Sequence, residues 1–212
     1  MLAKVHSSAV VGIDGHLVEV EVDISSGLPS FSTVGLPEGA VKESKERVKA
    51  AIKNSGYHFP PDRITVNLAP ADMKKEGAAF DLPMAVGILT ATELLPPEAF
   101  DKSLFLGELA LDGTVRPVKG ILPITVAAKS LGFKNILLPI DNAPEAAVVE
   151  GITVYPVRTL SQVVDALTSV EKISPFGEEI NRYTQPRRMD LDFREVRGQE
   201  NAKRAVEISA AG

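Results

Sequence analysis

Residues 107–139, GELALDGTVRPVKGILPITVAAKSLGFKNILLP, carry the clearest indication of the fold. Its first part places two strand-like runs around Asp112-Gly113, a pair of residues that favours a tight hairpin turn. Residues 121–132 then predict a helix, and residues 135–140 form an apolar run of strand length. A hairpin, a helix and a strand in close succession predict layers of mixed α and β structure.

The residues before this stretch are rich in strand signals. Two runs flank a turn at Ile13-Asp14-Gly15, and the second run alternates apolar with charged residues, as expected for a hairpin with one solvated face. A helix is expected to open at Pro37 and to end at Gly56. The other elements predicted here are strands at 3–12, 16–25, 31–36 and 63–70 and a buried helix at 78–95 with Pro83 in its first turn.

After the opening stretch, the pattern alternates between helix and strand. The expected elements are a short helix at 143–149, a strand at 152–157 and a helix at 159–167, for which Thr159 is a suitable N-cap. Strands and helices in this order predict an α/β fold built on a mixed sheet, with helices packed mostly on one face.

Composition limits the class of protein. The chain has 212 residues, a net charge of -5, 44% hydrophobic residues and no cysteine. The lack of cysteine excludes a disulfide framework and a thiolate metal site, and the first residues contain no apolar run long enough for a signal peptide or a membrane span. We therefore expect a cytoplasmic protein without membrane contact, divided into a domain at 1–169, a linker at 170–189 and a new unit at 190–212.

The last unit contains a turn, Val196-x-Gly198-Gln199, that leads into a helix. This motif resembles the entry to an AAA+ ATPase module, in which the backbone of such a turn lies against the adenine ring. The resemblance implies that Val196, Gly198 and Gln199 form the adenine side of a nucleotide site. The phosphate-binding motif G-x-x-x-x-G-K-[ST], which follows in that family, does not occur in these residues, so the chain is expected to be a piece of a longer protein.

Two longer signatures, residues 62–89 and 107–139, resemble the Mg-chelatase-like ComM/YifB family. In that family, a domain related to the Lon proteolytic domain precedes the AAA+ module. The resemblance implies the Lon-type fold, also described as ribosomal protein S5 domain 2-like, for the first part of the chain. It also implies a hexameric ATPase that processes DNA by branch migration during natural transformation, with ATP and Mg²⁺ in the full-length protein and no cofactor in this part.

The Lon relationship raises the question of a peptidase. Lon-type peptidases use a serine nucleophile with a lysine general base, and the resemblance places the serine at Ala78 or Ala79 and the lysine at Leu122. None of these side chains can perform the corresponding step, so no catalytic residue is predicted. An unconventional peptidase that uses Ser103 or Thr125, and a chelatase that inserts metal into a porphyrin, remain as alternatives.

Lys74 and Lys75 are candidates for a contact with DNA or a partner protein. They lie on a loop that enters a predicted helix, and the N-terminus of a helix attracts anions. A solvated loop with Glu76 near the helix start is the alternative interpretation.

Arg116 and Lys119 lie at the end of the predicted hairpin. Together with Asp81 and Glu108 they could form a charged cluster at one end of the domain, with either a structural or a binding role. The three histidines are scattered without metal-ligand spacing, so no metal site is predicted.

The helix after Pro37 presents a stripe of lysines on the side opposite its apolar residues. The stripe consists of Lys42, Lys45, Lys49 and Lys53. It could follow a phosphate backbone, but Glu38 and Glu46 lie on the same stripe, so a solvated, salt-bridged face is the preferred interpretation. No aromatic residue interleaves these lysines, and base stacking is therefore not expected there.

The sequence thus predicts a non-catalytic N-terminal domain of a ComM-type ATPase that contacts DNA or a partner. The parent protein is expected to self-associate into a hexamer through its AAA+ module. Lys74, Lys75, Arg116 and Lys119 are the residues predicted to make the contact.

Overall fold

The computed structural model describes residues 1–177 and 195–211, except for the side chain of Lys42. The chain divides into two compact units, Met1–Ile180 and Asn181–Gly212. The second unit contains one described α-helix, α7 (Glu200–Ala211). The predicted linker at 170–189 and the first residues of the predicted last unit lie largely outside the described residues. In the described ranges, no helix combines the length and the apolar character that crossing a membrane requires.

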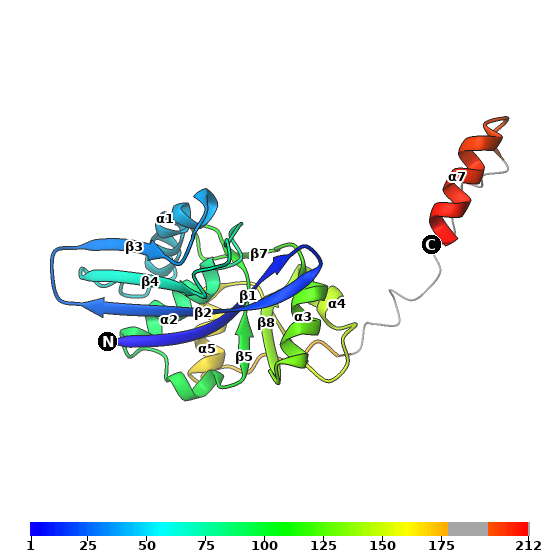
Figure 1. Ribbon diagram of the computed structural model, residues 1–212. Coiled ribbons are helices and arrows are strands. Elements are labelled where there is room, and N and C mark those ends of the chain that lie inside the picture. Colours follow the sequence, from blue (N-terminus) through cyan, green and yellow to red (C-terminus); the bar gives the residue numbers. More distant parts are fainter. Residues whose placement is uncertain (178–194, 212) are drawn as a thin grey trace. The chain divides into compact units, whose positions relative to one another are not determined.

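A mixed sheet of seven strands runs through the first unit (Figure 1). Its strands are β1 (Leu2–Val11), β2 (Asp14–Ser25), β3 (Ser30–Val34), β4 (Arg63–Ala69), β5 (Ser103–Phe105), β8 (Asn135–Pro139) and β9 (Thr153–Val157). The order across the sheet is β3-β4-β2-β1-β5-β8-β9. The pairs β1–β2 and β2–β4 are antiparallel and the other pairs are parallel, which confirms the expected mixed sheet.

Helices and one small hairpin connect these strands. The helices are α1 (Gly39–Asn54), α2 (Asp81–Ala91), α3 (Ile121–Ser130), α4 (Ala143–Ala146) and α5 (Leu160–Leu167), with 3-10 helices at Pro97–Phe100 and Ile140–Asn142. The predicted hairpin around Asp112-Gly113 is present as the pair β6 (Glu108–Leu109) and β7 (Val115–Arg116). Each element predicted in the first unit therefore has a counterpart at nearby residues.

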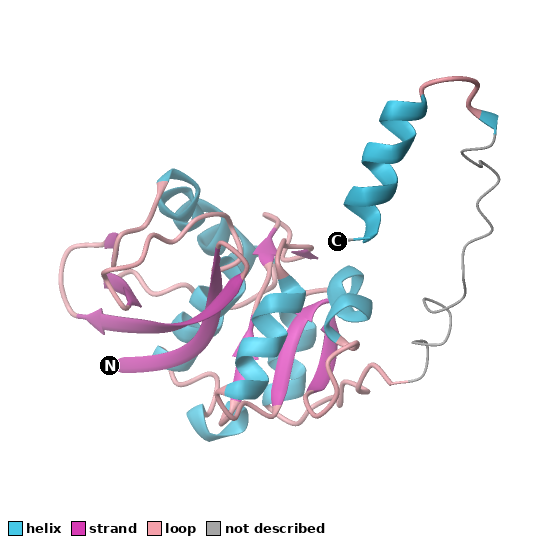
Figure 2. Ribbon diagram, turned by 45° about the vertical axis from the view of Figure 1, so that its right-hand side comes forward, coloured by secondary structure: helices cyan, strands magenta, loops and turns pink. Residues whose placement is uncertain are grey.

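Helices cover both faces of the sheet, which corrects the expectation that they lie mostly on one face (Figure 2). The larger apolar cluster contains residues of α1, α2 and α5, and the smaller one contains residues of α3 and α4. Neighbouring strand residues alternate between the clusters, since Phe105 and Leu137 belong to the larger one and Leu104 and Ile136 to the smaller one. Parallel strands that are covered on both faces have continuous apolar sequences. Such sequences do not indicate which helix lies on which face of the sheet.

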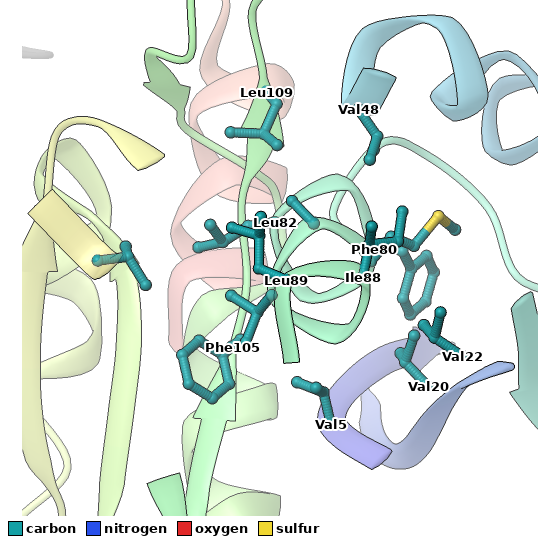
Figure 3. Packing of buried hydrophobic residues seen from close by; sticks show 14 of the residues in the cluster. Val5, Val20, Val22, Val48, Phe80, Leu82, Ile88, Leu89, Phe105 and Leu109 are labelled. Carbon is teal, nitrogen blue, oxygen red and sulfur yellow. The ribbon is translucent and has the colours of Figure 1, made fainter. Parts of the chain in front are cut away.

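The helix α2 is central to the larger cluster. All of its residues from Asp81 to Ala91 are buried, as predicted for a helix that is apolar on all sides. Figure 3 shows Leu89 on the side of Phe105 and Ile88 on the side of Val22. This helix therefore joins β5 to the antiparallel half of the sheet.

The two ends of α1 differ in how well local sequence predicts them. The helix begins at Gly39 rather than at the predicted Pro37, because Pro37 first pairs with Lys75 in an isolated parallel bridge. The other end is as predicted: the helix stops before Gly56, whose φ of 86° is left-handed. Glycine adopts this conformation without strain.

Thr159 should stabilise the fold as the N-cap of α5. Its hydroxyl oxygen accepts a hydrogen bond of 3.2 Å from the backbone N–H of Gln162, as predicted. Replacement of Thr159 with alanine removes this acceptor and should lower the free energy of unfolding by about 1 kcal/mol. Urea denaturation measures the loss. T159S keeps the hydroxyl and should lose much less, and an equal loss in both variants would contradict the capping role.

Candidate functional site

A cleft of about 790 Å³ opens between the β1–β2 hairpin, the loop after β4 and the residues before α3. Lys74 and Lys119, two of the predicted contact residues, both line it and are both exposed. Asp72 and Glu76 line the same cleft. The fold therefore brings two cations that are distant in sequence to one rim, which also carries carboxylates.

The lysine amines of this rim are available to a ligand. The amine of Lys74 lies 3.2 Å from Oε1 of Glu38, and the Lys74 side chain is 74% exposed. Exposed ion pairs of this kind contribute only about 0–1 kcal/mol, so another anion can replace Glu38 at small cost. Among residues 1–177 and 195–211, Lys119 has no carboxylate within 4.0 Å of its amine.

Lys75 does not belong to this rim, which corrects the prediction that it contacts a ligand. Its side chain is fully buried, and its amine donates a hydrogen bond to the carbonyl oxygen of Pro70. Burial lowers the pKa of the Lys75 amine. The backbone of Lys75 also bonds to Leu36 and Glu38, so this residue fastens the loop after β4 to the connection between β3 and α1.

The predicted cluster of Arg116, Lys119, Asp81 and Glu108 is divided in the structure. Arg116 lies on β7, 3.6 Å from Glu108, and it does not line the cleft with Lys119. Asp81 is buried and pairs with Arg47 of α1, with 2.6 Å between Nε and Oδ2. The prediction is therefore confirmed for Arg116 and Glu108, which pair with each other, and wrong for Asp81, which takes Arg47 as its partner, and for Lys119, which lies on the rim of the cleft.

The Arg47–Asp81 pair is structural, and Arg47 is a residue that the sequence patterns did not single out. Burial raises the pKa of the Asp81 carboxyl, and the hydrogen bond from Arg47 opposes the rise. The same hydrogen bond raises the pKa of Arg47. Helical spacing provides a signal for it, because Arg47 stands three residues after the buried Ser44 and four before the buried Ala51, on the flank of the apolar face away from the lysine stripe.

The described part of the lysine stripe of α1 contains one ion pair. Glu38 pairs with Lys74 rather than with a lysine of the stripe, and Glu46 lies 3.7 Å from Lys45. The side chain of Lys42 lies outside the described residues. The structure therefore has an ion pair of this stripe at Lys45, and the interpretation of a solvated, salt-bridged face stays a prediction where Lys42 is concerned.

A family model described as "Subunit ChlI of Mg-chelatase" matches residues 20–142, which is more than half of the chain. The chain belongs to this Mg-chelatase family. The match begins in β2 and ends in the 3-10 helix after β8, so it includes Lys74, Ala79 and Lys119 of the cleft. The family agrees with the resemblance that residues 62–89 and 107–139 carry.

Individual relatives extend this similarity over the whole chain. The chain is 44% identical over 211 residues to an uncharacterized protein of Mycobacterium tuberculosis and 42% identical over 214 residues to the competence protein ComM of Haemophilus influenzae. Both alignments cover all of this chain but only 41% and 42% of those proteins, so the chain spans about two fifths of their length. It is also 27% identical over 199 residues to Lon protease 2 of Bacillus subtilis, with 84% of this chain and 35% of that protein covered.

In this member of the Mg-chelatase family, hydrocarbon occupies the positions at which the resemblance to Lon peptidases places the serine and the lysine. Ala79 lines the cleft, and Leu122 lines an adjoining apolar hollow. The hydroxyl of Ser8 also lines the cleft, but it donates to the carbonyl oxygen of His16 at 2.8 Å. In the described ranges, no hydroxyl is hydrogen-bonded to a lysine amine, and a nucleophile with its base needs such a contact.

The alternative nucleophiles lie outside the cleft. Thr125 is buried within α3, where its hydroxyl donates to the carbonyl oxygen of Ile121 at 2.7 Å. Ser103 is buried at the start of β5 and accepts a hydrogen bond of 3.3 Å from the amide of Asn135. Both hydroxyls therefore have structural partners rather than a neighbouring base.

The second unit contains the predicted nucleotide residues. Val196, Gly198 and Gln199 are exposed and immediately precede α7, and Gly198 and Gln199 have φ values of 69° and 59°. The backbone N–H of Lys203 donates to the carbonyl oxygen of Gln199 at 2.9 Å, so the turn leads directly into the helix. Their role on the adenine side of a nucleotide remains a prediction. Among the residues described in both units, no group of three or more His, Asp or Glu side chains could hold a metal ion.

Proposed function

We propose that the first unit is a non-catalytic binding domain of a ComM-type AAA+ ATPase. The parent protein would be a cytoplasmic hexamer, assembled through its AAA+ module, that processes DNA by branch migration. The similarity to the competence protein ComM over the whole chain supports this assignment. ATP and Mg²⁺ would bind to the AAA+ module, with Val196, Gly198 and Gln199 on the adenine side.

The cleft is the observation that carries the proposal. It contains Ala79, one of the positions at which the resemblance to Lon peptidases places the serine, and Lys74 and Lys119 offer positive charge at its rim. A cleft of this kind can hold a ligand without reacting with it. Because Asp72 and Glu76 repel phosphate, a DNA backbone would be restricted to the part of the rim beside the two lysines.

Exchange of Lys74 and Lys119 for glutamine should weaken the binding of duplex DNA by the 212-residue chain. Each phosphate contact contributes about 0.9 to the slope of log K against log salt concentration, so the loss of both should reduce that slope by about 1.8. Fluorescence anisotropy of a labelled duplex over a range of salt concentrations measures the affinity and the slope together.

A charge-matched control is available for this experiment. Lys102 and Lys134 are exposed, and neither lines the cleft, so K102Q/K134Q removes the same charge elsewhere. This control should leave the salt slope as in the wild type. If K74Q/K119Q also leaves it unchanged, the cleft does not contact DNA.

The description of the family model favours a second candidate, a chelatase-type motor that inserts metal into a porphyrin. Its cleft would then contact a partner subunit rather than DNA. The ATPase activity of the intact parent protein distinguishes the two candidates, because a porphyrin would stimulate a chelatase-type motor and DNA would stimulate a ComM-type motor.

A further inference from the structure

A second hollow, of about 250 Å³, lies where the edge strand β3 and the loop before β4 meet α1. Lys45, Lys49 and Lys53 line it from α1, and Phe31 and Phe59 line it from β3 and the loop. It shares no lining residue with the cleft, so the two are separate places on the first unit.

The fold holds both aromatic rings of this hollow in place. Phe31 and Phe59 are partly buried against the larger apolar cluster. One part of each ring therefore packs against the cluster, and another part is exposed. The amine of Lys49 lies 6.0 Å from the centroid of the Phe59 ring, at the limit of a cation–π contact. No aromatic residue interleaves these lysines within the helix, but the fold brings both rings to them from outside it.

The cations of the hollow form a regular row. Lys45, Lys49 and Lys53 recur every four residues, which spaces them by about 6 Å along the helix axis. In the part of the chain that the structure describes, Lys49 and Lys53 have no carboxylate within 4.0 Å of their amines, and only Lys45 is paired, with Glu46 at 3.7 Å. The exposed Arg63 lies opposite Ser30 in the β3–β4 pairing, and its positive charge offsets that of Asp62, the carboxylate that lines the hollow.

We propose that this hollow and its lysine row bind single-stranded nucleic acid. Bases of a single strand can stack on an aromatic ring while lysines follow the phosphates, and this combination is typical of sequence-tolerant single-strand sites. The bases of a duplex are already stacked on one another, so a duplex would use the lysines but not Phe31 or Phe59. The inference deepens the proposed function and rests on its assumption that the protein acts on DNA.

The test uses the 212-residue chain and a fluorescent oligothymidylate of about 16 nucleotides, near the upper end of known single-strand site sizes. K45Q/K49Q/K53Q should lower the salt slope of binding by about 2, since each phosphate contact to a single strand contributes about 0.7. F59L should weaken binding about 5- to 150-fold, the effect of losing one stacked base, with the slope unchanged. F59Y keeps the ring and should bind like the wild type, which separates stacking from a loss of folding.

Three comparisons decide the outcome. The charge-matched K102Q/K129Q/K134Q variant replaces three exposed lysines elsewhere and should bind normally; an equal loss in this variant would overturn the site. If F59L binds like F59Y, or if duplex DNA competes as well as a single strand, the stacking contact is overturned. If only K74Q/K119Q weakens binding, the single-strand site is overturned and the proposed function stands. If the wild type binds duplex DNA but no oligothymidylate, the single-strand site is again overturned and the proposed function again stands.

Discussion

Replacement of Asp81 with alanine should lower the free energy of unfolding by about 3–5 kcal/mol, the usual loss when one partner of a buried ion pair is removed. Asp81 is fully buried, and its two carboxylate oxygens accept hydrogen bonds from Arg47 at 2.6 and 3.2 Å. One of these oxygens also accepts a bond of 3.2 Å from the backbone N–H of Leu109. The variant would leave the N–H of Leu109 without its acceptor and the charge of Arg47 without a carboxylate, with only the carbonyl oxygen of Ala40 and the hydroxyl of Ser44 to accept from it.

Urea denaturation of D81A beside two further variants tests this role. E108Q breaks the exposed pair with Arg116 and should cost less than about 1 kcal/mol. The double variant R47M/D81L replaces both charges with hydrocarbon and should lose less than D81A, because no charge is left without a partner. A loss in D81A no larger than in E108Q would show that the Arg47–Asp81 pair does not hold α1 against α2.

Replacement of Gly35 with alanine should lower the free energy of unfolding by about 2–5 kcal/mol, from left-handed backbone strain together with overpacking. Gly35 follows β3 and has a φ of 93°. A Cβ at this position would overlap the carbonyl group of Leu68 in β4, which is backbone and cannot rotate away. The change should therefore separate the edge strand from its neighbour.

Gly39 provides the matched control for this substitution. A Cβ at Gly39 meets nothing within 4 Å, and this residue begins α1 without a left-handed φ. G39A should be neutral or slightly stabilising, because it reduces the freedom of the unfolded chain. Equal unfolding free energies for G35A and G39A would rule out the close approach of β3 and β4 at Gly35.

The cleft shows how one fold can serve different purposes. The chain is similar to a Lon protease, and its cleft contains Ala79, where the resemblance places the serine. With hydrocarbon there and lysines on the rim, the same architecture is suited to holding a ligand. Function in such folds depends on the side chains of the site rather than on the arrangement of the strands.

Much of the fold could be predicted from short stretches of sequence. Asp112-Gly113, Gly56 and Thr159 mark a hairpin, a helix end and a helix start, and each does so through groups a few residues away. Pro37 predicted the wrong start for α1, because its bridge to Lys75 involves a distant loop. Lys74 and Lys119 were correctly placed at the surface, but their position on one cleft rim required the fold.

The order of the elements and the mixed sheet follow from local patterns in the sequence, because periodicity, turn residues and capping depend on near neighbours, and the family follows from the resemblance of residues 62–89 and 107–139. Which charges are available depends on the tertiary fold. It buries Lys75, joins Asp81 to Arg47 and places Phe59 beside Lys49. Burial and contacts between elements depend on how residues far apart in the chain pack together, and no local pattern records that packing.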